Sequence, residues 1–347
     1  MFPLRFVLLF IFSAYSAAMA SVVDLSRLDK IPGTCILEGE VLDCGQEEIL
    51  LNASTKMEKL RVKAAYIEIQ GKILGEELDL EATGDLVLKQ GAHLFLAKKS
   101  SFYSRREIQV HGGLFASRLK IVGASVLFSE SSDVQVQHLD ITSSDFKTKN
   151  RLIAQNLKIN LSNSDKKRLS SPYGELGGSV QAKVLNILGP GSGSRLVIRK
   201  QSFVDAEHIH ILTKSYLNFG YVRFALLSIN GQDHASYGKT SGGKYEAAAE
   251  NIRTHEGSLY QIQSAQIWGY DCKDEGKWNV ENTLGLYCQT MTAGPSSAQN
   301  TLYNRTLDAQ NREGESFCKA SASRRQMDRE GSKFLCRCDF LWPSFQY

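Results

Sequence analysis

Residues 78–88 read LDLEATGDLVL, and this stretch decides the predicted fold. It contains two short runs that begin and end with leucine, LDL and LVL. A turn that contains Gly84 lies between them. Alternation with a period of two residues is typical of a β-strand with one buried face and one solvated face. Similar runs recur from Leu60 to about Ile267, and proline is absent between positions 32 and 172. The sequence therefore predicts an all-β protein whose strands can form unbroken ladders of hydrogen bonds.

Equivalent apolar positions recur at a nearly constant interval. The intervals from Ile67 through Leu86 and Ile108 to Val126 are 19, 22 and 18 residues, and those from Leu119 through Leu139 to Leu157 are 20 and 18 residues. Such regularity is typical of a β-solenoid, because each coil places its strands directly on those of the coil before it. The pattern predicts a parallel β-helix. The alternative is an antiparallel β-sandwich, which also contains short strands separated by turns.

One charged residue lies between two apolar residues in each of three equivalent runs. These residues are Lys120, Asp140 and Lys158. If the coil interval is correct, their side chains stack on the outside of the solenoid as a ladder of alternating charge. Opposite charges on neighbouring strands stabilise a sheet by a few tenths to about 1 kcal/mol and help to fix its register.

The stretch ATGDLVL, residues 82–88, followed by GAHLFL, residues 91–96, resembles the repeats of filamentous-haemagglutinin-type bacterial adhesins. The likeness covers about one coil. In that family an A-x-G-D-L-x-L core marks one coil of a right-handed β-helix. The resemblance implies a right-handed parallel β-helix and an exported, adhesin-like role at a bacterial surface.

The N-terminus has the pattern of a cleaved export signal. Arg5 precedes the apolar stretch 6–17, and Ala18-Met19-Ala20 forms a small-x-small cleavage site. We expect residues 1–20 to be removed and the mature chain to begin at Ser21. The mature protein is then secreted, periplasmic or bound to the cell surface, and no later apolar run is long enough to span a membrane.

Seven cysteines remain after cleavage, and disulfide bonds are the default in an oxidising compartment. Cys35 and Cys44 flank a short segment that a bridge could hold as a hairpin, and Cys272 with Cys288 is the preferred second pair. The pairing of the remaining cysteines stays open; they are Cys318, Cys336 and Cys338. Zinc binding is the alternative use, but the spacing in Cys336-Arg337-Cys338 differs from that of common zinc sites.

These patterns divide the chain into four parts. They are a signal peptide (1–20), an N-terminal cap with the Cys35/Cys44 hairpin (21–59), a β-solenoid with a protruding loop at 162–179 (60–269) and a cysteine-rich C-terminal cap (270–347). Short helices are expected over Lys244–Arg253 and from about Ser297. Loops around Lys166–Tyr173 and His234–Lys244 are the expected places for binding specificity.

The sequence contains no established catalytic motif, and we predict no catalytic, metal-ligating or cofactor-binding residue and no cofactor. Net charge falls from +4 to +3 when the segment with Arg5 is removed, which argues against a nucleic-acid partner. His208 and His210 lie on one face of a predicted strand, but two imidazoles do not complete a zinc site, so we interpret them as solvent-facing.

The predicted function is therefore that of an exported binding or structural β-solenoid. Its expected partner is a polysaccharide or a surface protein, since the ladder faces of a solenoid form an extended, repetitive surface. The alternative is a polysaccharide lyase or glycoside hydrolase on the same fold, because one scaffold can host either function.

Overall fold

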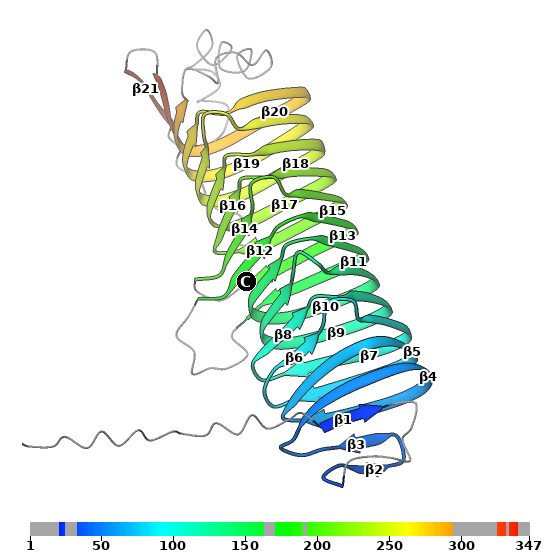
Figure 1. Cartoon of the computed structure of the whole chain (residues 1–347). Coiled ribbons are helices and arrows are strands. Elements are labelled where there is room, and N and C mark those ends of the chain that lie inside the picture. Colours follow the sequence, from blue (N-terminus) through cyan, green and yellow to red (C-terminus); the bar gives the residue numbers. More distant parts are fainter. Residues whose placement is uncertain are drawn as a thin grey trace, which may run out of the picture.

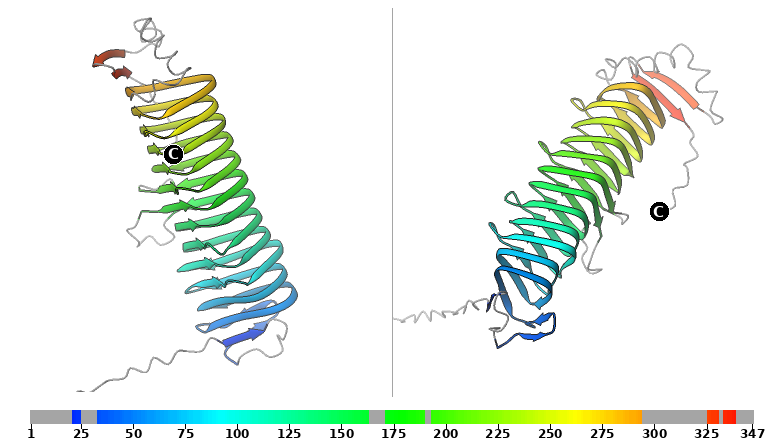
Figure 2. Two further views of the ribbon diagram at one scale, coloured as in Figure 1. Left: turned by 45° about the horizontal axis from the view of Figure 1, so that its top comes forward. Right: turned by 90° about the vertical axis from the view of Figure 1, so that its right-hand side faces the viewer.

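A computed structural model describes residues 21–24, 33–162, 171–189, 193–293, 325–330 and 333–338. Side chains are not described at 21, at 24, at 53–56, at 283–293 and in the two C-terminal segments. All regular elements in the described ranges are β-strands, and they stack into a β-solenoid of about 11 turns. Figures 1 and 2 show an elongated stack that begins with β4 and ends with β20. No described helix is long and apolar enough to cross a bilayer.

The coils are formed by long strands that bend around corners and by shorter strands between them. Their bounds are β1 Ser21–Asp24, β2 Ile36–Glu38, β3 Val41–Asp43, β4 Glu48–Ala64, β5 Tyr66–Ala82, β6 Leu86–Leu88, β7 His93–Ser104, β8 Glu107–Val110, β9 Gly113–Phe128, β10 Asp133–Thr148, β11 Arg151–Leu161, β12 Tyr173–Leu176, β13 Ser179–Gly189, β14 Arg195–Ile198, β15 Phe203–Thr213, β16 Ser215–Asn218, β17 Tyr221–Ser236, β18 Lys239–Thr254, β19 Leu259–Asp274, β20 Lys277–Ala293, β21 Arg325–Glu330 and β22 Lys333–Cys338.

One coil has three sides, and strand β9 with the turn that follows it contains a complete coil. Residues 113–116 form its first side, 118–122 its second side and 125–128 its third side. Along each side the buried residues alternate with residues that face outward. We call each level of the stack a rung, and we use the names first, second and third side for the equivalent residues of every coil.

Parallel pairing of equivalent residues confirms the predicted coil interval. Ile67 pairs with Leu86, Leu86 with Ile108 and Ile108 with Val126 on the third side. Leu119, Leu139 and Leu157 pair in the same way on the second side. Antiparallel pairs in the described ranges are confined to β2 with β3, and to β22 with β20 and β21. The sandwich alternative is therefore wrong.

The charged ladder predicted on the second side is also confirmed. Asp140 pairs in register with Lys120 on one neighbouring strand and with Lys158 on the other. Both lysines are exposed and Asp140 is half-buried, while the flanking leucine and isoleucine residues are buried. The side chain of Asn160 also donates a hydrogen bond to Asp140 Oδ1 at 3.1 Å. The three charges thus lie outside the solenoid at successive rungs.

The core runs through the centre of the stack, and its composition changes along the axis. In the early coils the inward third-side positions hold aliphatic residues such as Ile67, Leu86 and Ile108. Further along the same inward row, Tyr216 and His234 are 2% and 3% exposed. This inward row therefore changes from aliphatic residues in the early coils to Phe146 and then to Tyr216 and His234 further along the axis.

Two sequence predictions around residue 244 are wrong. The expected helix over Lys244–Arg253 is part of strand β18, and Ala247, Ala248 and Ala249 are buried in the coil. The helix propensity of an alanine run is overridden because this segment pairs in parallel with β17 on one side and with β19 on the other. The expected specificity loop at His234–Lys244 instead comprises the end of β17, a two-residue turn and the start of β18.

The coils extend beyond the expected range of 60–269. Strand β4 already pairs in parallel with β5 along its whole length, and β20 continues the stack to Ala293. Within the expected loop at 162–179, residues 173–176 form β12 and pair with β10, whereas 163–170 lie outside the described residues. The helix expected from Ser297 and most of the C-terminal cap also lie outside the described residues.

The N-terminal end of the stack is covered by short strands. β1 pairs with the third side of β4, and β3 pairs with its second side. β2 and β3 form the expected hairpin, and a disulfide bond joins Cys35 to Cys44. Coverage of this kind protects a sheet edge from pairing with other chains.

The second predicted disulfide involves residues near the other end. Cys272 is buried in β19 and is disulfide-bonded. The side chain of Cys288 lies outside the described side chains, as do those of Cys318, Cys336 and Cys338. The pairing of Cys272 with Cys288 therefore stays a prediction.

Candidate ligand-binding groove

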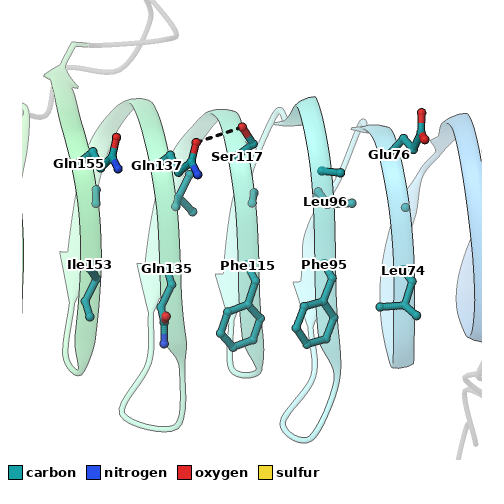
Figure 3. Close-up of a pocket in the computed structure, with 15 residues that line it drawn as sticks. Leu74, Glu76, Phe95, Leu96, Phe115, Ser117, Gln135, Gln137, Ile153 and Gln155 are labelled. Atoms are coloured by element: carbon teal, nitrogen blue, oxygen red, sulfur yellow. Dashed lines mark hydrogen bonds between the residues drawn. The ribbon is translucent and has the colours of Figure 1, made fainter.

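A shallow groove of about 910 Å³ crosses five rungs on the first side of the solenoid. Each rung contributes an outward residue to the groove and the two residues that follow it. The lining residues are Leu74, Gly75, Glu76, Phe95, Leu96, Ala97, Phe115, Ala116, Ser117, Gln135, Val136, Gln137, Ile153, Ala154 and Gln155. Figure 3 shows the labelled side chains in two rows, with Leu74, Phe95, Phe115, Gln135 and Ile153 in one and Glu76, Ser117, Gln137 and Gln155 in the other.

The groove has an apolar row where a solvated strand face normally has polar side chains. Leu74 is 40% exposed, and Phe95, Phe115 and Ile153 are half-buried although they point outward. The rings of Phe95 and Phe115 stack with their centroids 4.7 Å apart and their planes 8° apart. The ammonium of Lys72 lies 5.2 Å from the centre of the Phe95 ring. A row of apolar side chains along the axis is thus held in a defined position.

Gly113 leaves the space that this aromatic arrangement requires. A Cβ atom at Gly113 would lie 2.4 Å from Nδ1 of His93 and 2.7 Å from a ring carbon of Phe115. Both rings therefore lean over the glycine from neighbouring positions. A larger residue at position 113 would therefore require one or both rings to move. The backbone at Gly113 does not adopt a positive φ angle, so the close approach of the rings is what favours glycine here.

Amide side chains at one end of the groove offer both donors and acceptors. Gln135 donates through Nε2 to Asp133 at 3.1 Å, which leaves its carbonyl oxygen available. Gln137 accepts from the Ser117 hydroxyl at 3.4 Å, which leaves its NH₂ group available (Figure 3). Gln155 is exposed and makes no side-chain hydrogen bond within the described part of the chain. A ligand with many hydroxyl groups suits this set, because each hydroxyl donates and accepts.

Glu76 is the one ionisable residue among those that line the groove within the described chain. Its carboxylate forms an ion pair with Lys98 at 2.6 Å, which offsets its charge. The predicted histidines lie elsewhere, in β15, where His208 is exposed and His210 is half-buried. The described residues contain no group of three or more histidine, cysteine, aspartate or glutamate side chains that could hold a metal ion.

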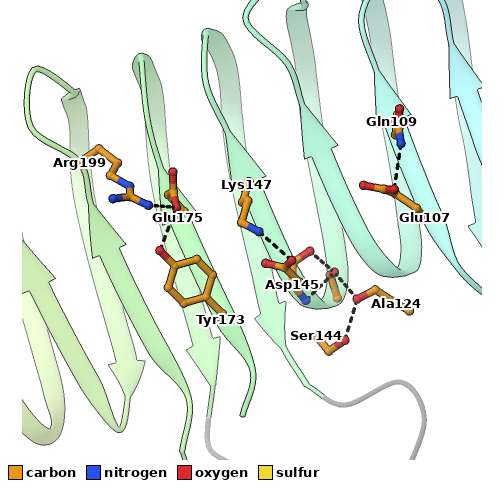
Figure 4. Close-up of polar contacts among 10 residues, drawn as sticks. Glu107, Gln109, Ala124, Ser144, Asp145, Lys147, Tyr173, Glu175 and Arg199 are labelled. Carbon is orange, nitrogen blue, oxygen red and sulfur yellow. Dashed lines mark hydrogen bonds and ion pairs between the residues drawn. The ribbon is translucent and has the colours of Figure 1, made fainter. Parts of the chain in front are cut away.

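A cluster of charged residues lies on the third side of the solenoid (Figure 4), whereas the groove lies on the first side. Glu175 is only 7% exposed, and it accepts hydrogen bonds from Tyr173 at 2.8 Å and from Arg199 at 2.6 Å. On the preceding coil Lys147 forms an ion pair with Asp145 at 2.9 Å. The same pattern occurs in an earlier coil, where Glu68 is bonded to Tyr66 and Lys89.

The electrostatics of the Tyr173–Glu175 pair keep the glutamate charged and the tyrosine neutral. Burial raises the pKa of Glu175, but hydrogen bonds from Arg199 and Tyr173 outweigh it and hold the pKa below its usual value. Burial and the nearby carboxylate raise the pKa of Tyr173 to about 12. Such a cluster fixes the register of neighbouring coils, and its charged groups are already paired with one another.

A second row of aromatic side chains lies at the corner between the third and first sides. Phe219 and Tyr237 are 39% and 42% exposed, and their rings stack at 4.8 Å. His255 stacks on the other face of Tyr237 at 3.8 Å. Because most ring faces in this row cover one another, its main effect is to hold successive turns in register.

Sequence reasoning missed the groove, although a signal for it exists. Inward and outward residues alternate, so an outward apolar residue produces a run of three apolar residues in a strand. Leu94-Phe95-Leu96, Leu114-Phe115-Ala116 and Leu152-Ile153-Ala154 are such runs, and they fall at equivalent positions of separate coils. Aligned by rung, these runs identify an apolar row on the outside.

Comparisons of the chain with family models, curated proteins and solved structures found no match. The β-solenoid fold therefore rests on the strand pairing itself. The resemblance of residues 82–96 to filamentous-haemagglutinin repeats has no matching relative to support it and stays a prediction of the sequence.

Proposed function

We propose that this protein is an exported β-solenoid that binds a neutral polysaccharide along the groove on its first side. The observation that carries the proposal is the combination of stacked Phe95 and Phe115 with three glutamine amides in one straight, open groove. Binding sites for small organic groups combine apolar walls with a few placed polar groups in this manner.

The geometry of the groove favours a linear polymer. Its rungs follow the spacing of β-strands, about 4.8 Å, so five rungs cover about 19 Å along the axis. Each rung presents its outward side chains at equivalent positions of the coil, and this regular spacing suits a ligand that repeats along its length. The groove is open along its side, so that a chain longer than the groove can lie across it.

The side chains of the groove favour a sugar polymer over a peptide strand. The strands of the first side already pair with a neighbouring strand on each edge. Their backbone groups are therefore not available to pair with a peptide strand by β-augmentation. Phe95 and Phe115 cover one ring face of each other, and the ring edges that this stack leaves uncovered can contact apolar C–H groups of a sugar. The amides of Gln135, Gln137 and Gln155 can bind its hydroxyl groups.

Charge favours a neutral polymer. The lining residues carry one carboxylate, Glu76, and it is paired with Lys98. An anionic polymer would gain little from this groove, since attraction by unpaired cations dominates the binding of polyanions. The predicted export signal at residues 1–20 supports a location where extracellular or cell-wall polysaccharides occur.

Affinity electrophoresis and calorimetry with the mature chain from Ser21 test the proposal. The neutral polymers are xylan, mixed-linkage β-glucan and galactomannan, and the anionic ones are polygalacturonate and alginate. We expect binding to at least one neutral polymer, with affinity reduced at least about tenfold, or about 1.4 kcal/mol, in the double variant Phe95→Ala/Phe115→Ala. Tyr103→Ala is the matched control, since Tyr103 is 40% exposed and lies on the second side.

Two results would contradict this function. One is the absence of binding to all of the neutral polymers by the wild-type chain. The other is equal affinity of wild type and the Phe95/Phe115 double variant, with circular dichroism showing that both are folded.

Cleavage of a polysaccharide is the second candidate function, and the carboxylates of Asp145 and Glu175 favour it. They lie on neighbouring rungs of the third side beside Lys147 and Arg199 (Figure 4). The same incubations, with and without calcium, would reveal new chain ends. Loss of those ends in Glu175→Gln would assign the third side as a catalytic surface, whereas binding without new ends supports the groove alone.

A further inference from the structure

The first side continues beyond the groove without a break in register. Ile153, the last apolar residue of the groove, pairs with Gln181. Gln181 pairs with Asp205, and Asp205 pairs with Arg223. The surface that lines the groove therefore extends for three more rungs along the same side.

An aromatic pair lies on the last two of these rungs. Phe203 and Tyr221 occupy equivalent outward positions, and their ring centroids are 5.3 Å apart. Both residues are half-buried. Phe203 and Tyr221 lie two residues before Asp205 and Arg223, which are in register with the apolar row of the groove. The aromatic pair is therefore one outward position away from that row, on the side of the corner that precedes the strand.

Contacts on both sides hold this pair in place. The Tyr221 hydroxyl lies 2.7 Å from the Ser241 hydroxyl on the next rung. The guanidinium of Arg223 lies 5.4 Å from the centre of the Phe203 ring, and Arg223 Nε donates to Asp205 at 2.9 Å. Asp205 offsets the charge of Arg223 beside the aromatic pair, just as Lys98 offsets the charge of Glu76 in the groove.

The rung between the groove and the aromatic pair carries neutral side chains in the two rows that lead to that pair. These residues are Ser179 and Gln181, and Gln181 is exposed. Lys183 is also exposed, but it lies in the separate row that contains Gln155. A chain that follows the rows of Ser179 and Gln181 therefore meets no charged side chain on this rung. Gln181 adds another amide to the row formed by the groove glutamines.

We infer that the polysaccharide site spans eight rungs, from Leu74 to Tyr221, and that Phe203 and Tyr221 form its second aromatic contact. This inference rests on the proposed function and deepens it by setting the length of the ligand. Eight rungs include seven intervals, which cover about 34 Å along the axis, against about 19 Å for the groove alone. A chain that reaches both contacts binds more tightly, because the second contact forms within the same complex.

Oligosaccharides of graded length, prepared from whichever of xylan, mixed-linkage β-glucan or galactomannan binds, test this length by calorimetry on the mature chain. We expect affinity to rise as the oligomer fills the groove and to rise again, by about tenfold or more, once it spans both contacts. The double variant Phe203→Ala/Tyr221→Ala removes the second rise and leaves the affinity of short oligomers unchanged. Tyr103→Ala changes neither rise.

The outcomes separate the inference from the function on which it rests. If long oligomers bind no better than those that fill the groove, or if the Phe203/Tyr221 variant keeps the second rise, the extended site is wrong and the groove proposal stands. If the Phe203/Tyr221 variant weakens short and long oligomers equally, the two contacts do not form one track and the inference is also overturned. If none of the polymers binds, both proposals are overturned.

Discussion

Single residues in this solenoid have roles that depend on which way they point. Phe115 and Leu119 are both apolar, yet Phe115 lines the external groove whereas Leu119 is 2% exposed in the core. Gly113 is required because two rings lean over it, and His234 is enclosed by the core although its chemistry suits a surface. Substitutions at these last two positions have distinct expected effects.

Gly113→Ala should weaken both the groove and the fold. The added methyl group meets His93 and Phe115, and overpacking of this kind costs roughly 1 to 3 kcal/mol unless the rings move. If the Phe115 ring moves, its stack with Phe95 is lost and polysaccharide affinity falls. Urea denaturation and calorimetry measure the two effects. Gly33→Ala is the control, since a Cβ there meets no atom within 4 Å; equal behaviour of the two variants would contradict the role assigned to Gly113.

His234 should make the protein less stable in acid. Burial lowers its pKa from 6.5 to about 4, so the unfolded chain binds the proton more readily than the folded one. The contribution of His234 to the free energy of unfolding is fully present above pH 6.5. It falls as the pH drops from 6.5 toward 4, by roughly 3 kcal/mol in total.

Thermal melting of wild type and His234→Phe at several pH values tests this effect. Between pH 6.5 and 4 the melting temperature of wild type should fall more steeply than that of the variant, which has no proton to gain. Phenylalanine suits the aromatic surroundings of Tyr216 and Tyr245. Parallel curves for the two proteins would show that His234 does not set the acid response.

At the scale of elements, the same outward position repeated from strand to strand forms a ladder. Lys120, Asp140 and Lys158 form a charged ladder, and Phe219, Tyr237 and His255 form a stacked aromatic one. Each strand pairs with one strand on either side, so an outward side chain such as Asp140 lies next to side chains of both neighbouring coils. Ladders therefore help to select one register among those that the hydrogen bonds alone would permit.

Asp140→Lys should destabilise the stack by placing three like charges on successive rungs. The expected loss is roughly 1 kcal/mol at low ionic strength, because like charges directly opposite one another on neighbouring strands repel. Added salt should recover most of that loss, since the two lysines on either side of position 140 are exposed and all three charges face the solvent. Asp140→Asn is the control, because it removes the attraction without adding repulsion. Urea midpoints that are independent of salt would contradict the electrostatic role of the ladder.

Much of the stack could be predicted from the sequence, for a physical reason. Inward positions must be apolar in every coil, so alternation and the interval from Ile67 to Leu86 and Ile108 predict the correct pairs. The groove could not be recognised from apolar content alone, since Phe95 looks like a core residue until its outward direction is known. Ala247–Ala249 suggested a helix because propensity is a local property, whereas burial between coils is not.

At the scale of the whole molecule, stability is distributed along an axis. Each coil contacts only its neighbours, so the ends of the stack are the weakest points and their covers matter most. β1 and β3 cover the first full coil, and the Cys35–Cys44 bridge closes the hairpin that includes β3.

Replacing both cysteines, Cys35→Ser/Cys44→Ser, should loosen the N-terminal end first. Closing so short a loop restricts the unfolded chain and is worth roughly 2 to 3 kcal/mol. Hydrogen exchange should become faster in β2, β3 and the second side of β4, while β9 and β10 keep their protection. Equally faster exchange in all coils would show that the hairpin is not a local cover. Reduction of the wild-type protein is a less specific control, because Cys272 is also disulfide-bonded.

Each of the five coils that line the groove contributes an outward residue and the two residues that follow it, so the length of the groove is set by the number of coils. Val136 lies directly above Ala116, so residues 117–136 form one complete module of the stack. Excising them would join Ala116 to Gln137, which occupies the position equivalent to Ser117, and would remove the Gln135 step from the groove. Duplication or loss of such modules can therefore change the length of polymer that the groove binds, while the remaining coils keep their structure.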